Sequence, residues 1–125
     1  MSVDRLSQFA GEKYLNLETY RKTGQAVATP VWFAQDAVVL YIYSLADAGK
    51  VKRIRNNPRV RVTPCDMRGK LKGEWVEARA RIVQGAEAAK GHQLLDEKYG
   101  LLKKIGNVFS KLRKRERVVI AIELD

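Results

Sequence analysis

The sequence predicts a mainly β protein built on a small antiparallel barrel, closed or split, with helices packed outside it. Three observations predict this fold class. About six segments of strand length carry alternating or continuous apolar residues, short polar turns join most of them, and the chain has 125 residues. Connections of hairpin length favour antiparallel pairing, and alternating faces in so short a chain are typical of a barrel. We therefore expect a single domain over residues 1–125.

The first two strands are predicted to form a hairpin. Residues 14–20 alternate apolar and polar side chains, and residues 25–34 are rich in β-branched and aromatic residues. The sequence Lys-Thr-Gly at residues 22–24 predicts the turn between them. Pro30 lies inside the second strand, where it removes a hydrogen-bond donor. It therefore predicts a sheet edge or a bulge at that position.

A strand and a basic helix follow. Residues 38–43 are almost continuously apolar and predict a central strand. The next segment, residues 43–64, carries six bases and a single acid, Asp47. Asp47 is placed to cap a helix over about residues 48–57, and Pro58 ends that helix because proline cannot continue it.

Three more strands and two helical segments complete the chain. The strands are predicted from alternating or continuous apolar residues at 59–65, 74–83 and 118–124. Residues 86–99 predict a helix with Gly100 as its C-cap. Residues 101–114 carry apolar side chains at helical spacing with lysines on the opposite face, which predicts an amphipathic helix packed on the barrel.

The composition favours an anionic partner. The net charge is +10, which is high for this length. Nucleic acid is one candidate partner, and a phosphorylated cofactor or an acidic small molecule is another. The aromatic residues are not interleaved with the bases as they are in a stacking platform for nucleic acid, so we favour the small molecule.

The sequence also indicates a compartment. A single cysteine excludes an internal disulfide and fits a reducing environment. No apolar run approaches the roughly 18 residues of a membrane span, and the first residues lack the apolar core of a signal peptide. We therefore expect a cytoplasmic protein without a membrane partner.

No residue pattern predicts catalysis by side chains alone. His92 is the only histidine and Cys65 the only cysteine, so neither a Ser-His-Asp set nor a His/Cys metal cluster is present, and we expect no metal. Cys65 has no histidine nearby in the sequence to activate it, so we expect a quiet, partly buried thiol. Trp75 is expected in the core or at an interface between protomers.

The start of the basic helix predicts a phosphate site. Free backbone N–H groups point out of a helix N-terminus, and here the local side chains are positive. The alternative is a solvated helix and an exposed strand face, which we keep for Arg55, Arg59 and Arg61.

Four sequence motifs, in this order, resemble a known family. They are TPVWF at 29–33, VLYIYS at 39–44, GKVKRIRNNPRVRV at 49–62 and GEWVEARARIV at 73–83. Together with the spacing Lys50-x-x-x-Ile54-x-x-Asn57-Pro58, they resemble the flavin-binding split-barrel family related to pyridoxamine 5′-phosphate oxidase. The sequence is most similar to its small members labelled F420-dependent oxidoreductases. The resemblance covers residues 14–83 and extends to the KYG sequence at 98–100.

The resemblance implies a homodimer of six-stranded split barrels, with FMN or F420 in a groove at each end of the interface. Lys50 matches the family lysine at the cofactor phosphate, and Lys52 and Arg53 are placed to assist it. Ser44 matches a small hydroxyl residue near the phosphate. The residues matching the strand along the flavin ring are Thr29, Pro30, Val31 and Trp32.

The resemblance further implies an oxidoreductase that moves a hydride to or from a small organic substrate. The cofactor carries that chemistry, so no catalytic side chain is assigned. The family label and the charge favour F420 slightly over FMN. The chain is shorter than true pyridoxamine phosphate oxidases and lacks their C-terminal substrate-binding Arg and His residues, so we expect a different substrate.

Two other functions stay open at this point. One is a flavin-binding carrier or sensor with little turnover. The other is a basic module that binds nucleic acid, in which the amphipathic segment 101–114 contributes its lysines. Alternatively, three lysines of this segment, Lys103, Lys104 and Lys111, hold the polyglutamate tail of F420.

Overall fold

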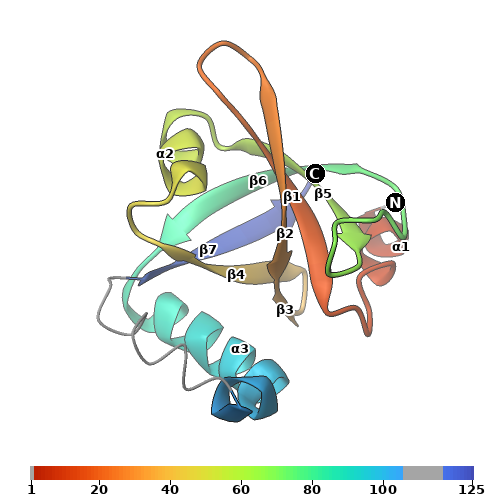
Figure 1. The fold of residues 1–125 in the computed structure, drawn as a ribbon, viewed down its shortest axis with the longest axis vertical. Helices are drawn as coiled ribbons and strands as arrows, with labels where there is room; N and C mark the ends of the chain where they lie inside the picture. Colours follow the sequence, from red (N-terminus) through yellow and green to blue (C-terminus); the bar gives the residue numbers. More distant parts are fainter. Residues whose placement is uncertain (1, 106–116) are drawn as a thin grey trace.

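A seven-stranded antiparallel sheet forms the centre of the protein (Figure 1). The computed structural model describes residues 2–105 and 117–125, and the side chains of residues 5–100 and 117–125 within them. The strand order across the sheet is β2-β1-β5-β6-β7-β4-β3. The strands are β1 (Tyr14–Tyr20), β2 (Ala26–Trp32), β3 (Ala34–Asp36), β4 (Val39–Leu45), β5 (Arg59–Cys65), β6 (Val76–Val83) and β7 (Arg117–Leu124).

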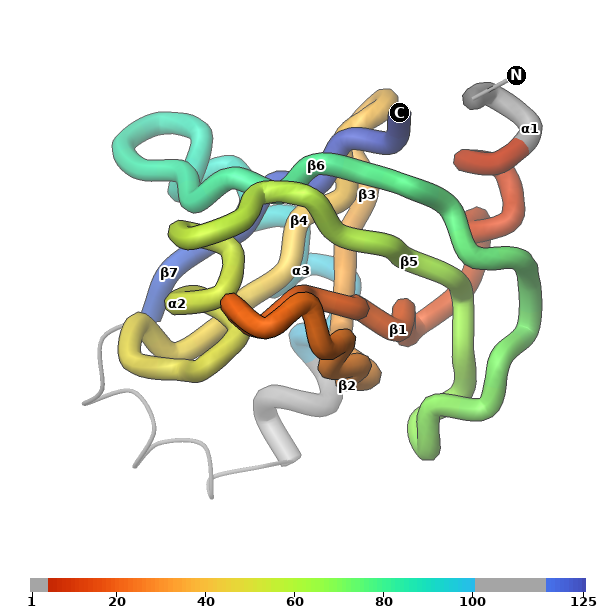
Figure 2. Tube along the Cα trace, turned by 90° about the horizontal axis from the view of Figure 1, so that it is seen from above, coloured from red at the N-terminus to blue at the C-terminus, as the bar shows by residue number. Residues whose placement is uncertain are grey.

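The two edges of this sheet are consecutive in the chain. Strands β2 and β3 lie at opposite ends of the strand order, yet only Phe33 separates them. The sheet therefore has to curl until its edges approach each other, as Figure 2 shows. Strands β2 and β4 come close without pairing, which leaves the split of a split barrel.

The predicted fold class is confirmed, and one strand differs from the prediction. The sequence predicts a single strand over residues 25–34, with a turn at Gln35 and Asp36. The structure divides it at Phe33, so that β2 pairs with β1 while β3 pairs with β4. The count is therefore seven strands rather than six. Pro30 lies in the edge strand β2, as its missing donor requires.

The core fills the inside of the curled sheet. Alternate residues of β1 and β5 point inward, and the near-continuous apolar runs of β4 and β7 supply both faces of the sheet. The largest fully buried side chains of this core include Leu15, Leu17, Leu40, Ile42, Val60, Val62, Ile120 and Ile122. A second cluster, which includes Tyr41, Leu95, Tyr99 and Val119, lies between the sheet and a helix outside it.

Three helices surround the sheet, and two predictions about their ends are wrong. Helix α2 (Gly49–Asn56) buries Val51 and Ile54, but its N-cap is Ala48, without a side-chain hydrogen bond, and Asp47 is exposed one residue earlier. Helix α3 (Gly85–Ile105) continues through Gly100 instead of ending there. The third helix is α1 (Ser2–Ser7).

The segment 101–114 falls outside the side chains that the structure describes. Its predicted apolar stripe and its lysines therefore stay a prediction. Among the described residues, no helix is both long enough and apolar enough to cross a membrane.

Candidate functional site

The first turns of α2 carry two cations that lack an acidic partner. Lys50 and Arg53 lie one turn apart on the helix, and both are half-buried. In the described part of the chain, neither forms an ion pair with a carboxylate. Burial lowers the pKa of Lys50, and the neighbouring Arg53 guanidinium lowers it further. A bound anion would remove this electrostatic penalty.

The guanidinium of Arg53 is held in place by two neighbours. Its Nε donates a hydrogen bond of 2.6 Å to Oγ1 of Thr19, a fully buried residue of β1. Its Nη1 occupies the space beside Gly49, where an added Cβ would lie only 2.7 Å away. The absence of a side chain at Gly49 therefore leaves room for the guanidinium at the start of the helix.

A third cation extends this cluster. Burial lowers the pKa of Arg53, and the charge of Arg21, just after β1, lowers it further. Three like charges without an acid among them are unfavourable unless an anion joins them. With free N–H groups at the start of α2, the donor set fits a phosphate.

Strand β2 borders the split and has one edge that none of the described strands covers. Its residues pair with β1 only. Thr29 and Val31 lie opposite Leu17 and Leu15, so they point toward the inside of the barrel. Pro30 and Trp32 are the alternate residues and point to the other face. The unpaired edge offers backbone N–H and C=O groups to a planar ligand.

Helix α3 fixes the backbone at the junction of β2 and β3. The Tyr99 hydroxyl accepts a 3.1 Å hydrogen bond from the N–H of Phe33 and lies 2.7 Å from its carbonyl oxygen. It also lies 2.6 Å from the carbonyl oxygen of Lys13. The Tyr99 ring stacks on Trp32, with centroids 4.6 Å apart and an angle of 3° between the planes. Burial raises the pKa of Tyr99 to about 12, so the hydroxyl stays protonated at neutral pH.

Lys98 reinforces the same junction. Its Nζ donates to the carbonyl oxygens of Glu12 at 2.7 Å and Phe33 at 2.8 Å. It also lies 3.8 Å from the centroid of the Phe33 ring. Burial of the amine lowers the pKa of Lys98 to about 8, against the opposing charge of Glu12. The KYG sequence thus secures the end of β2.

The sequence profile of the pyridoxamine 5′-phosphate oxidase family matches residues 4–125. The chain belongs to the pyridoxamine 5′-phosphate oxidase family. No protein of curated function matches its sequence closely enough to count as a relative.

Solved structures confirm the fold of this pyridoxamine 5′-phosphate oxidase family member. An FAD-binding protein from Mesorhizobium loti superposes with a TM-score of 0.65 and 19% identity, covering 100% of this chain and 88% of its own. An F420 reductase superposes with a TM-score of 0.61 and 21% identity, covering 95% of this chain and 91% of its own. A heme storage protein from Vibrio cholerae superposes with a TM-score of 0.67 and 14% identity, covering 95% of this chain and 86% of its own. These different activities show that the fold alone does not decide the function.

The structure brings together some of the residues that the family resemblance predicts. Lys50 and Arg53 share one side of α2, whereas the exposed Lys52 lies about 200° around the helix from Lys50. Ser44 is buried at the inner face of β4, where its Oγ lies 3.1 Å from the carbonyl oxygen of Leu45. Thr29 and Val31 face inward while Pro30 and Trp32 do not. A cofactor role for these eight residues stays a prediction.

Two members of this cluster were missed by sequence reasoning. Thr19 lies in β1 and Arg21 directly follows that strand, so both are far from Arg53 in the sequence. Only the packing of α2 on β1 brings them close to Arg53. Their residue types carry no local signal, since a threonine in a strand and an arginine after it are ordinary.

The remaining candidates do not contribute to the cluster. Cys65 is buried, and burial raises its pKa to about 11, which fits an unreactive thiol. The ring of Trp75 lies 5.0 Å from Arg61, which itself pairs with Glu18 at 2.7 Å. Arg55 and Arg59 are exposed as predicted and Arg61 is half-buried, but Arg59 also forms ion pairs, with Glu77 at 3.4 Å and Asp125 at 3.0 Å. Within the described residues, no group of three His, Cys, Asp or Glu is placed to hold a metal.

Proposed function

We propose that this protein is an oxidoreductase that binds FMN or F420 beside α2 and exchanges a hydride with a small organic substrate. The observation that supports this most strongly is the pair Lys50 and Arg53. Both are half-buried cations without an acidic partner among the described residues, at a helix start that offers free N–H groups. Family membership supports the same function.

Each part of the cluster has a distinct task in this proposal. Lys50 and Arg53 hold the cofactor phosphate, and Thr19 keeps the Arg53 guanidinium in position through its 2.6 Å hydrogen bond. The uncovered edge of β2 presents backbone groups to the polar edge of the ring. Lys98 and Tyr99 keep the end of that edge fixed at Phe33. The bound cofactor supplies the hydride chemistry.

We further propose a homodimer. The split between β2 and β4 provides one wall for a planar ligand, and a second protomer supplies the other. The proposed working environment is the reducing cytoplasm, which suits the single buried thiol Cys65.

A side-by-side fluorescence titration of the purified protein with FMN and with F420 tests the proposal. Tight binding of either ligand supports it and selects the reductant to assay next, with NAD(P)H for FMN. A carrier or sensor would bind the ligand but show negligible turnover with any acceptor. Binding of neither ligand, together with strongly salt-dependent binding of DNA, would instead establish the nucleic-acid module.

A further inference from the structure

A hollow lies beside the β1–β2 hairpin, at the other end of α2 from the candidate phosphate site. Its volume is about 410 Å³, within the usual range of small-molecule sites. It lies between the turn of the hairpin and the last turn of α2. Its lining residues are Tyr20, Arg21, Lys22, Gly24, Asn56 and Asn57.

Among the described residues, the side chains that line this hollow are two cations, two amides and Tyr20, and none is an acid. Arg21 and Lys22 make no ion pair with any residue that the structure describes. The Asn57 Oδ1 accepts a 3.1 Å hydrogen bond from the N–H of Arg59, which leaves the amide NH₂ donors of Asn57 for a ligand. The lining therefore offers hydrogen-bond donors and positive charge to an anion.

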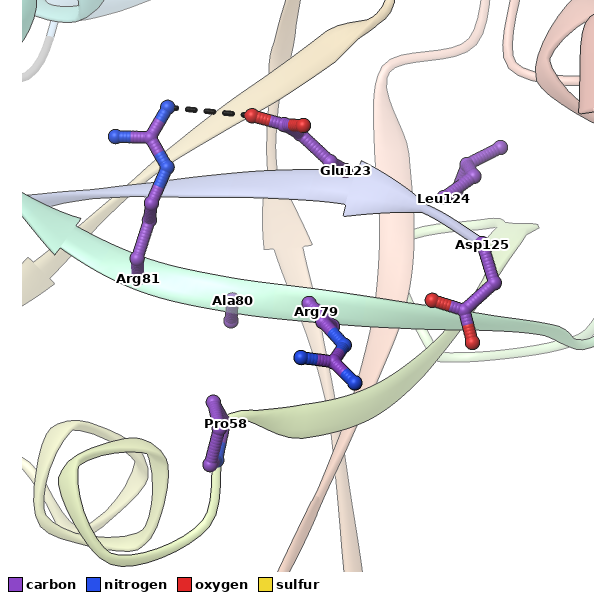
Figure 3. A pocket seen from close by; sticks show the side chains of 7 residues that line it. All are labelled: Pro58, Arg79, Ala80, Arg81, Glu123, Leu124 and Asp125. Atoms are coloured by element: carbon purple, nitrogen blue, oxygen red, sulfur yellow. Dashed lines mark hydrogen bonds and ion pairs between the residues drawn. The ribbon is translucent and has the colours of Figure 1, made fainter.

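A second hollow on the basic surface has a different lining. It has a volume of about 340 Å³ and lies beside β6 and β7 (Figure 3). There Arg81 pairs with Glu123 at 3.2 Å, and Asp125 also lines the hollow. The acids that line this second hollow largely neutralise its cations, so its lining does not favour an anionic ligand.

The hairpin hollow lies at the other end of α2 from the phosphate site, and strand β1 links the two. Arg53 donates a 2.6 Å hydrogen bond to Thr19 of β1, and the next two residues of the chain, Tyr20 and Arg21, line the hollow. Arg21 lines the hollow and is also close enough to Arg53 to lower the pKa of that guanidinium. Arg53 and Arg21 thus link the positive charge at the start of α2 with the positive charge at the hairpin.

We propose that the hairpin hollow binds a second anionic group of the same cofactor, carried on a chain that extends beyond the first phosphate. This inference rests on the proposed function and narrows it. A cofactor that ends at its first phosphate, such as FMN, would leave Arg21 and Lys22 without a partner. A pyrophosphate chain, as in FAD, or a carboxylate tail, as in F420, would reach them.

Dissociation constants for FMN, FAD and F420 test the inference, measured for the parent protein and for Arg21→Gln/Lys22→Gln. The parent should bind FAD or F420 about tenfold or more tightly than FMN. The double variant should lose about tenfold or more for that tail-bearing ligand and at most about threefold for FMN, because Arg21 also adds positive charge near the phosphate site. Both residues are exposed, so the fold should be unaffected, which circular dichroism checks.

The matched control is Arg5→Gln/Arg79→Gln. It removes two exposed charges, one of them on α1, which lies across the barrel from α2 (Figures 1 and 2). It should leave all three constants unchanged within about twofold. Equal losses of affinity for all three ligands in Arg21→Gln/Lys22→Gln would mean that the two charges attract every anionic ligand at long range and bind no tail, which would overturn the inference. So would unchanged affinities or a parent that binds FMN best, although the proposed function would then stand. Failure of the parent to bind any of the three would overturn both.

Discussion

Gly49 and Arg53 are fitted to each other at the start of α2. The Nη1 atom of Arg53 lies where a Cβ on residue 49 would approach to 2.7 Å, and its Nε is bonded to Thr19 on the other side. The guanidinium is therefore positioned by a missing side chain and one hydrogen bond. This arrangement holds a cation ready for an anion without the help of an acid.

The variant Gly49→Ala should weaken cofactor binding without weakening the fold. The added methyl group displaces the flexible end of Arg53, so affinity should fall by about threefold to tenfold. Alanine favours the helix by up to about 1 kcal/mol, so the melting temperature should stay the same or rise slightly. Ligand titration and thermal unfolding measure the two effects. An unchanged affinity would mean that the position of Arg53 does not matter for binding.

Cofactor affinity should fall as the pH rises. Burial and Arg53 lower the pKa of Lys50 from its ordinary value of 10.5, and a bound phosphate raises that pKa again. Binding therefore takes up a proton in the alkaline range below about pH 10.5, and affinity declines through it. Titrations from pH 7 to pH 10 measure the slope.

The control for this slope is Lys50→Arg, since arginine stays charged throughout the range. The part of the pH dependence that comes from Lys50 should disappear in that variant. The same slope in both proteins would assign the titration to another group.

The variant Tyr99→Phe should destabilise the protein. Removing the hydroxyl leaves the buried N–H of Phe33 without a partner, which costs about 1–3 kcal/mol, while the Phe33 carbonyl oxygen keeps its hydrogen bond from Lys98. Urea unfolding measures the loss. Tyr14→Phe is the matched control, because the Tyr14 hydroxyl makes no hydrogen bond with a described residue. Similar stabilities of the two variants would contradict a role for Tyr99 at this junction.

Lys98 should make stability depend on pH above 8. Its pKa is about 8 in the folded protein and near 10.5 when unfolded, so both states are charged below pH 8. Between these two values the unfolded chain binds more protons, and the free energy of unfolding should rise with pH. Lys98→Met should flatten this rise when urea midpoints at pH 7.5 and pH 10 are compared. A stability that falls more steeply in the parent than in Lys98→Met would reverse the sign and refute the assignment.

The sequence was informative where local pattern decides structure. Alternation in β1, β5 and β6, the continuous apolar run of β7 and the edge position of Pro30 were all predictable. The break at Phe33 was not, because it depends on contacts with Lys98 and Tyr99, which are 65 and 66 residues away. The predicted cap at Asp47 was wrong because α2 begins at Gly49, which makes Ala48 the N-cap.

Some residues of the candidate site could likewise be predicted from the sequence, and others could not. Lys50 and Arg53 could be predicted from charge at a helix start and from family resemblance. Thr19 and Arg21 could not, since the curling of the sheet alone brings β1 against α2.

The central claim is that Lys50 holds the phosphate of a flavin or deazaflavin, and comparison of Lys50→Ala with Lys52→Ala tests it most directly. Both variants remove one positive charge from α2, but Lys52 is exposed and lies off the side that carries Lys50 and Arg53. Titration with the ligand that the parent binds best should show a loss of about 1.5–3 kcal/mol for Lys50→Ala, roughly 10- to 100-fold. Lys52→Ala should lose less than about threefold, and both should unfold like the parent. If Lys50→Ala binds as tightly as the parent, the phosphate is not held at this helix.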